Sequence, residues 1–105
     1  MSLRPPTQSF QNLRYFTEKW SWLDPATGYR TTGYNPPAEA KGKQQVPFYI
    51  KYVTGKGRLE YGNAVCLKTY PRLHQRMIMF CQSGEIRRIR DYLVIEVDGT
   101  RIITH

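Results

Sequence analysis

From Val46 onward, short runs of valine, isoleucine, tyrosine and phenylalanine alternate with glycine-bearing turns. Branched and aromatic side chains favour strands, because they pack well on a pleated, half-buried surface. Asp98-Gly99 is the strongest turn signal in the chain, since a two-residue hairpin turn needs positive φ at its central positions. Thr54 to Gly57 holds two glycines in four residues and predicts a second tight hairpin. The pattern therefore predicts a mainly β domain that begins near residue 46.

Six runs in this part of the chain are expected to form strands. They are residues 46–53, 58–70, 76–81, 85–90, 93–97 and 100–104. Five or six short antiparallel strands in one small domain are typical of an SH3-like or Sm-like barrel. A barrel of this size buries only about 60% of the surface that its unfolded chain exposes. We therefore expect the N-terminal segment or a second copy of the chain to add stability.

The order of features in residues 46–105 also resembles that of Sm-type small barrels. The resemblance rests on the Gly-Lys-Gly-Arg turn at 55–58, the bend at 60–62, the connection at 68–74 and the final hairpin around Asp98-Gly99. It covers about half of the chain. It implies a fold but no binding site, because the connection at 68–74 replaces the aspartate-containing loop with which that family binds bases.

The N-terminal segment carries signals for two different structures. Apolar side chains recur at helical spacing from Phe10 to Trp20, behind Ser9, which is a residue type that caps helices well. In contrast, the alternation of Trp20-Ser21-Trp22 ahead of the turn residues 24–28 favours a hairpin. The sequence does not decide between the helix and the hairpin, and both remain as predictions.

A change of composition near residue 45 divides the chain. Five of the seven prolines lie in residues 1–45. Residues 36–45 hold no large apolar side chain, so they cannot bury enough surface to offset the entropy lost on ordering and are expected to form a linker. The sequence therefore predicts an aromatic, proline-containing extension and linker over residues 1–45, followed by the barrel over residues 46–105.

The chain is strongly basic, with 16 Lys and Arg against 8 Asp and Glu and a net charge of +8. Ten basic and five acidic residues lie in 46–105, so the excess is +5 there and +3 in residues 1–45. The charge is spread through the folded part and favours an anionic partner. It is densest at 87–90, where Arg88, Arg90 and then Tyr92 fall on one face of an extended chain.

Arginine and tyrosine together favour nucleic acid as the anionic partner. Arginine forks pair with phosphates, and aromatic rings stack on bases with little sequence preference. We therefore expect a non-enzymatic protein that binds RNA or DNA through phosphate contacts, with Tyr70 or Tyr92 available for stacking. The predicted nucleic-acid-binding residues are Lys56, Arg58, Lys68, Tyr70, Arg72, Arg76, Arg87, Arg88, Arg90 and Tyr92. The alternative interpretation of these cations is an ordinary solvated surface that keeps the protein soluble.

A second hypothesis is a protein-interaction or self-assembly module. Tryptophan is enriched at protein interfaces, and an unpaired strand edge can accept a strand from a partner. The Trp20-Trp22 segment would then form the interface, or an edge strand would pair with a partner or with a second copy.

No catalytic residue, metal ligand, cofactor or membrane association is predicted. Cys66 and Cys81 lie fifteen residues apart inside apolar runs, and with the two histidines they match no zinc spacing. Both cysteines are expected to be reduced and buried. No apolar run approaches the roughly 20 residues that span a bilayer, and the N-terminus lacks the apolar region of a signal peptide. We therefore expect a cytoplasmic protein.

Overall fold

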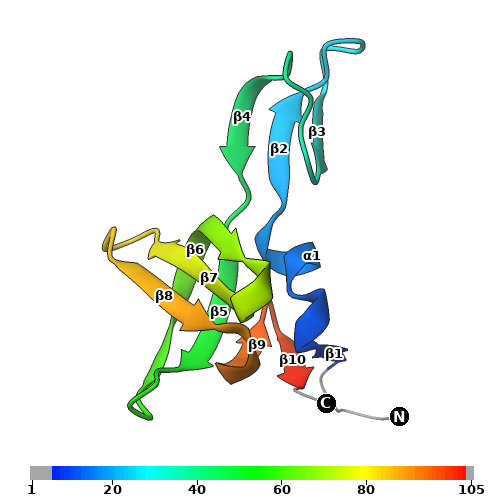
Figure 1. The fold of residues 1–105 in the computed structure, drawn as a ribbon. Helices are drawn as coiled ribbons and strands as arrows, with labels where there is room; N and C mark the ends of the chain where they lie inside the picture. The colour runs from blue at the N-terminus through cyan, green and yellow to red at the C-terminus, as the bar shows by residue number, and fades with distance from the viewer. Residues whose placement is uncertain (1–5, 104–105) are drawn as a thin grey trace.

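The computed structural model describes residues 6–103 (Figure 1). Most of them belong to two β-sheets, which confirms the prediction of a mainly β protein. The larger sheet comprises β1 (Thr7–Ser9), β5 (Phe48–Val53), β6 (Leu59–Tyr70), β7 (Gln75–Phe80), β8 (Ile86–Arg90), β9 (Val94–Val97) and β10 (Thr100–Ile103). The smaller sheet comprises β2 (Trp20–Leu23), β3 (Arg30–Gly33) and β4 (Lys41–Gln45). Short helical turns connect the strands: η1 (Phe10–Asn12), α1 (Arg14–Thr17), η2 (Pro71–Leu73) and η3 (Asp91–Leu93).

The larger sheet is open, so the prediction of a closed barrel is corrected. Its strand order is β1-β10-β9-β5-β6-β7-β8, with β1 and β8 at the two edges. After β8 the chain turns through η3 and enters β9, which pairs with β5 on the far side of the sheet. Among the described residues β8 pairs with β7 alone. Three of its five residues are arginines, and charged side chains are one way in which proteins keep an edge strand unpaired.

The core lies on one face of the larger sheet. Strand β5 alternates strictly, with Phe48, Ile50 and Tyr52 buried and the intervening residues only half-buried. Leu13, which comes from the N-terminal segment, is 0% exposed and packs in the same cluster. The segment also contributes β1, which pairs in parallel with β10. The core therefore depends on residues from both sides of position 45, and the proposed division of the chain at that position stays a prediction.

The N-terminal segment contains the predicted helix and the predicted hairpin one after the other. Ser9 caps η1, because its Oγ accepts a hydrogen bond of 3.2 Å from the backbone N–H of Gln11. The chain then makes one α-helical turn in α1 and enters β2. Strands β2 and β3 form the hairpin around the predicted turn, in which the N–H of Gly28 donates to the carbonyl of Asp24 at 2.8 Å.

Residues 41–45 form β4, although their composition predicts part of a linker. Strand β4 pairs with β2, so backbone hydrogen bonds hold it while its polar side chains stay largely exposed. The resulting three-stranded sheet, β3-β2-β4, stands clear of the larger sheet in Figure 1, and we call it the wing.

Two further findings concern the cysteines and the helices. Cys66 is buried as predicted, whereas Cys81 is exposed, because it lies in the turn after β7 and not inside the strand.

Between residues 6 and 103, no helix has the length and apolar character needed to cross a membrane.

Candidate nucleic-acid interface

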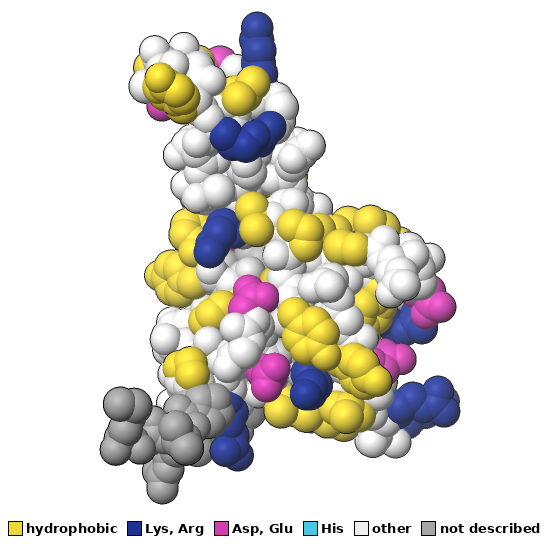
Figure 2. All heavy atoms as spheres, turned by 180° about the vertical axis from the view of Figure 1, so that it is seen from behind, with side chains coloured by type: hydrophobic (Ala, Val, Ile, Leu, Met, Phe, Trp, Pro, Cys, Tyr) yellow, Lys and Arg dark blue, Asp and Glu magenta, His cyan; other side chains and the backbone are white. Residues whose placement is uncertain are grey.

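Cationic side chains gather in a cleft between the β5–β6 turn and strand β8. The cleft has a volume of about 640 Å³. Five cationic residues and one acidic residue are among those that line it: Lys56, Arg58, Arg87, Arg88, Arg90 and Glu60. We call this site the basic cleft. In Figure 2, which shows the molecule from behind, dark blue side chains project at the right margin of the body, the side that carries β8 and the β5–β6 turn.

The turn between β5 and β6 presents Lys56 and Arg58 to the cleft. The backbone N–H of Arg58 donates to Thr54 Oγ1 at 3.0 Å, and the N–H of Thr54 donates to the Arg58 carbonyl at 2.8 Å. Gly57 has a φ of 83°, a conformation that favours glycine. These bonds close the predicted hairpin and leave both cationic side chains exposed.

Strand β8 divides its arginines between its two faces. Ile89 is 3% exposed and faces the core together with Arg87, because alternate residues of a strand share a face. Arg88 and Arg90 are exposed on the opposite face, as the sequence predicts. Beyond Arg90 the chain enters η3, where the Tyr92 hydroxyl accepts a weak hydrogen bond of 3.4 Å from Arg90 Nη1.

Arg87 differs from the other arginines of the cleft because acidic side chains partner it. Its Nε lies 3.6 Å from Glu60 Oε1, and its Nη2 also forms an ion pair with Glu85. Glu60 in turn accepts a hydrogen bond from the hydroxyl of Tyr52. Burial raises the pKa of Tyr52 above its ordinary value, and the hydrogen bond to the Glu60 carboxylate raises it further. No carboxylate in residues 6–103 forms a salt bridge with Lys56, Arg58, Arg88 or Arg90.

Arg88 is held in place by residues from two neighbouring strands. Its Cζ lies 4.0 Å from the centre of the Tyr70 ring, and its Nε donates to Gln75 Oε1 at 2.7 Å. The Nζ of Lys68 lies 5.1 Å from the same ring. The pairing of Lys68 with Met77, and of Met77 with Arg88, brings these side chains to one face of β6, β7 and β8. The sequence singles out Lys68, Tyr70 and Arg88 as separate candidates, and the structure brings the three together.

Arg76 lies inside the protein, so we remove it from the predicted binding surface. It is 7% exposed, and its Nε and Nη2 donate to the two carboxylate oxygens of Asp91 at 2.9 and 3.2 Å. Its Nη1 donates to Thr17 Oγ1 and lies 3.4 Å from Glu18 Oε2. Burial opposes the charge of Arg76, but the hydrogen bonds and the charge of Asp91 outweigh burial and raise its pKa. Arg76 therefore joins α1 and η3 to β7.

Arg72 and the two tryptophans lie away from the basic cleft. Arg72 is exposed on η2 and is not among the residues that line the cleft. Trp20 and Trp22 lie on β2 of the wing and are half-buried. The Trp22 ring covers Gly33, where an added Cβ would come within 3.0 Å of it.

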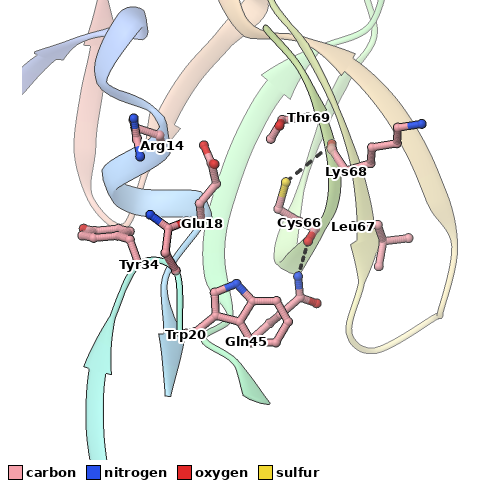
Figure 3. Close-up of a pocket in the computed structure, with 10 residues that line it drawn as sticks. Arg14, Glu18, Trp20, Tyr34, Gln45, Cys66, Leu67, Lys68 and Thr69 are labelled. Atoms are coloured by element: carbon pink, nitrogen blue, oxygen red, sulfur yellow. Dashed lines mark hydrogen bonds between the residues drawn. The ribbon is translucent and has the colours of Figure 1, made fainter. Parts of the chain in front are cut away.

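Trp20 lines a separate pocket of about 190 Å³ where the wing joins the larger sheet. Figure 3 shows Trp20 and Glu18 beside this pocket, and Gln45 donating a hydrogen bond to the carbonyl of Cys66. The side chain of Lys68 extends away from the pocket in this view, which agrees with its position near Tyr70. This pocket and the basic cleft have no lining residue in common.

The part of the chain that the structure describes holds no group of three or more His, Cys, Asp and Glu side chains placed to bind a metal ion. Sequence reasoning missed two residues that matter at the cleft or beside it, Gln75 and Glu60, and it missed Asp91, which holds the buried Arg76. Each acts on an arginine that lies between 13 and 27 residues away in the sequence. Only the folded arrangement of strands and helical turns reveals these contacts.

No protein-family model, no curated protein and no solved structure matches the chain.

Proposed function

We propose that the protein binds nucleic acid at the basic cleft, without catalysis and chiefly through phosphate contacts. The observation that carries this proposal is the gathering of five cationic side chains around one cleft that contains a single lining carboxylate, Glu60. Glu60 pairs with Arg87, so four cations remain available for phosphate oxygens. A solvated surface with no ligand would be expected to intersperse cations with acidic side chains.

The proposal revises the set of residues that the sequence predicts. Lys56, Arg58, Arg88 and Arg90 form the phosphate-binding set, and Lys68 flanks it beside Tyr70. Arg87 has a smaller role, because Glu60 and Glu85 neutralise part of its charge. Tyr92 is exposed next to Arg90 and offers a ring for stacking. Arg76 is left out, and Arg72 is kept only as a distant contact.

Salt dependence of binding tests this proposal. The affinity of the full chain for a labelled single-stranded oligonucleotide of about 12 residues is measured by fluorescence anisotropy between about 50 and 200 mM salt. Four phosphate contacts predict that the logarithm of the association constant falls with the logarithm of the salt concentration with a slope of about −3. Absence of binding at the lowest salt concentration would overturn the proposal, as would an affinity that does not change with salt.

We also propose that residues 46–103 form an SH3-like or Sm-like small barrel that is left open beside β8. The strand order β9-β5-β6-β7-β8 supports this proposal, because it places the late strand β9 next to the first strand of this part. Closure would require pairing at the exposed edge of β8, which is the arginine-rich edge that lines the cleft. Residual dipolar couplings, which report the relative orientations of the strands in solution, test this proposal, and a flat sheet without curvature between β5 and β8 would contradict it.

A second candidate function is self-assembly or protein binding through the wing. Trp20 and Trp22 are only half-buried on β2, and β3 and β4 have unpaired outer edges among the described residues. A sheet of three strands that stands clear of the body would gain buried area from a partner. Sedimentation velocity over a wide range of concentrations tests for self-association. A monomer at every concentration would exclude self-assembly.

A further inference from the structure

We propose that the basic cleft recognises single-stranded nucleic acid, with one base stacked on the guanidinium of Arg88 and the open edge of β8 contacting the edges of bases. This inference rests on the proposed function and adds the class of substrate. Three observations carry it: the unpaired edge of β8, the position of Arg88 over the Tyr70 ring, and the exposed tyrosine beside Arg90.

Strand β8 presents unpaired backbone groups at the cleft. The N–H of Phe80 donates to the carbonyl of Glu85 at 2.9 Å, and the N–H of Asp91 donates to the carbonyl of His74 at 2.8 Å. Hydrogen-bonded and non-hydrogen-bonded pairs alternate in an antiparallel ladder, so Arg87 and Ile89 direct their backbone groups toward β7.

The backbone N–H and C=O groups of Arg88 and Arg90 therefore point away from β7, toward the open edge. Edge groups of this kind are donors and acceptors that normally pair with another strand. Base edges carry donors and acceptors at similar spacing, and in a single strand they are free to form such bonds. Arginines that flank this edge discourage pairing with a second copy of β8, because like charges would then lie opposite one another.

Arg88 provides a flat surface next to this edge. Its Cζ lies over the Tyr70 ring, 4.0 Å from the ring centre, and its Nε is held by the hydrogen bond to Gln75. Arg88 is exposed, and in this proposal a base packs on the side of the guanidinium that is remote from Tyr70. Unstacked bases pack on arginine planes as well as on aromatic rings. Tyr70 is thus a positioning residue for Arg88, and the base itself lies on the guanidinium.

Tyr92 extends this surface along the chain. Tyr92 is 46% exposed, and its hydroxyl contacts Arg90. An arginine plane and an aromatic ring beside the same edge strand suit successive unpaired bases. In a duplex the faces and the pairing edges of the bases are already engaged, so only phosphate contacts with the arginines would remain.

The experiment measures the affinity of the whole 105-residue chain for a labelled oligonucleotide of about 12 residues and mixed sequence. The affinity for the single strand is compared with the affinity for the same strand annealed to its complement, at fixed low salt. Arg88→Lys keeps the charge but removes the plane, and Tyr70→Leu removes the ring that supports it. The matched controls are Arg101→Lys, which makes the same change at an exposed arginine on β10, and Tyr70→Phe, which keeps the ring. Circular dichroism verifies that each variant is folded.

We expect the single strand to bind at least about tenfold more tightly than the duplex. Arg88→Lys and Tyr70→Leu should weaken single-strand binding about five- to tenfold or more, while duplex binding changes less than about twofold. Arg101→Lys and Tyr70→Phe should bind like the unaltered protein. Equal affinities for the two forms, or an unchanged single-strand affinity in Arg88→Lys, would overturn this inference while the phosphate-binding function stands. Absence of binding to both forms would overturn the proposed function itself.

Discussion

The guanidinium of Arg88 on β8 lies 4.0 Å from the centre of the Tyr70 ring on β6. Strand β7 lies between the two and supplies Gln75, whose side-chain oxygen accepts a hydrogen bond from Arg88 at 2.7 Å. Three consecutive strands thus fix one exposed arginine at the mouth of the basic cleft. A fixed cation loses less side-chain entropy on binding than a freely rotating one, so this arrangement favours a ligand.

Arg76 and Asp91 should be essential for stability and should contribute little to binding. Arg76→Ala leaves the buried carboxylate of Asp91 without its partner, which predicts a loss of about 3 to 5 kcal/mol in the free energy of unfolding. Urea denaturation measures this loss. Arg72→Ala removes an exposed arginine four residues away and should change the free energy by less than about 0.5 kcal/mol. Equal effects of the two substitutions would contradict the assignment of Arg76 to the interior.

The N-terminal segment should stabilise the larger sheet. Leu13 is fully buried in the core, so Leu13→Ala should lower the free energy of unfolding by about 2 to 5 kcal/mol. Gln11→Ala changes an exposed residue of the same segment and is the control. A small effect of Leu13→Ala in denaturant titrations would mean that residues 46–105 hold their core without the extension.

Stability should fall at alkaline pH because of Tyr52. Burial and the hydrogen bond to Glu60 raise its pKa in the folded protein above the value of about 10 in the unfolded chain. Above that pH the unfolded chain releases a proton that the folded protein retains, so the contribution is present below about pH 10 and is lost as the pH rises.

Thermal denaturation at about pH 8 and about pH 11 measures this effect. Tyr52→Phe has no phenolic proton, so its melting temperature should fall less between the two pH values than that of the unaltered protein. The same fall in both proteins would show that another group is responsible.

The two cysteines should react with thiol reagents at very different rates. Burial raises the pKa of the Cys66 thiol and shields it, whereas Cys81 is exposed in a turn. We expect one thiol to react rapidly with a maleimide and the other only as fast as the protein opens. Cys81→Ser should remove the rapid phase. A rapid phase that persists in this variant would contradict the burial of Cys66.

The sequence predicts those parts of the fold that depend on local patterns. The run 46–53 is predicted as a strand and contains β5, and glycine marks the turn that presents Lys56. Strand β4 could not be predicted, because its polar residues show no alternation and the strand forms through backbone bonds to β2.

The candidate site could be predicted as a list of cations but not as a geometry. Tyr70 and Arg88 are 18 residues apart in the sequence, and only the registers of β6, β7 and β8 bring them together. Arg76 resembles any other basic residue beside a strand until its pairing with Asp91 is seen. The net charge of +8 contains no information about which cations are internally paired.

The most direct test of the account compares two double variants that have the same net charge. The quantity measured is the affinity of each variant for a single-stranded oligonucleotide. Arg88→Ala with Arg90→Ala removes two cations from the basic cleft, and Lys41→Ala with Lys43→Ala removes two exposed cations from the wing. We predict that the first pair weakens binding at least about tenfold at fixed salt and that the second weakens it less than about threefold. Equal losses in the two variants would show that net charge alone attracts the nucleic acid, and would contradict a site at the basic cleft.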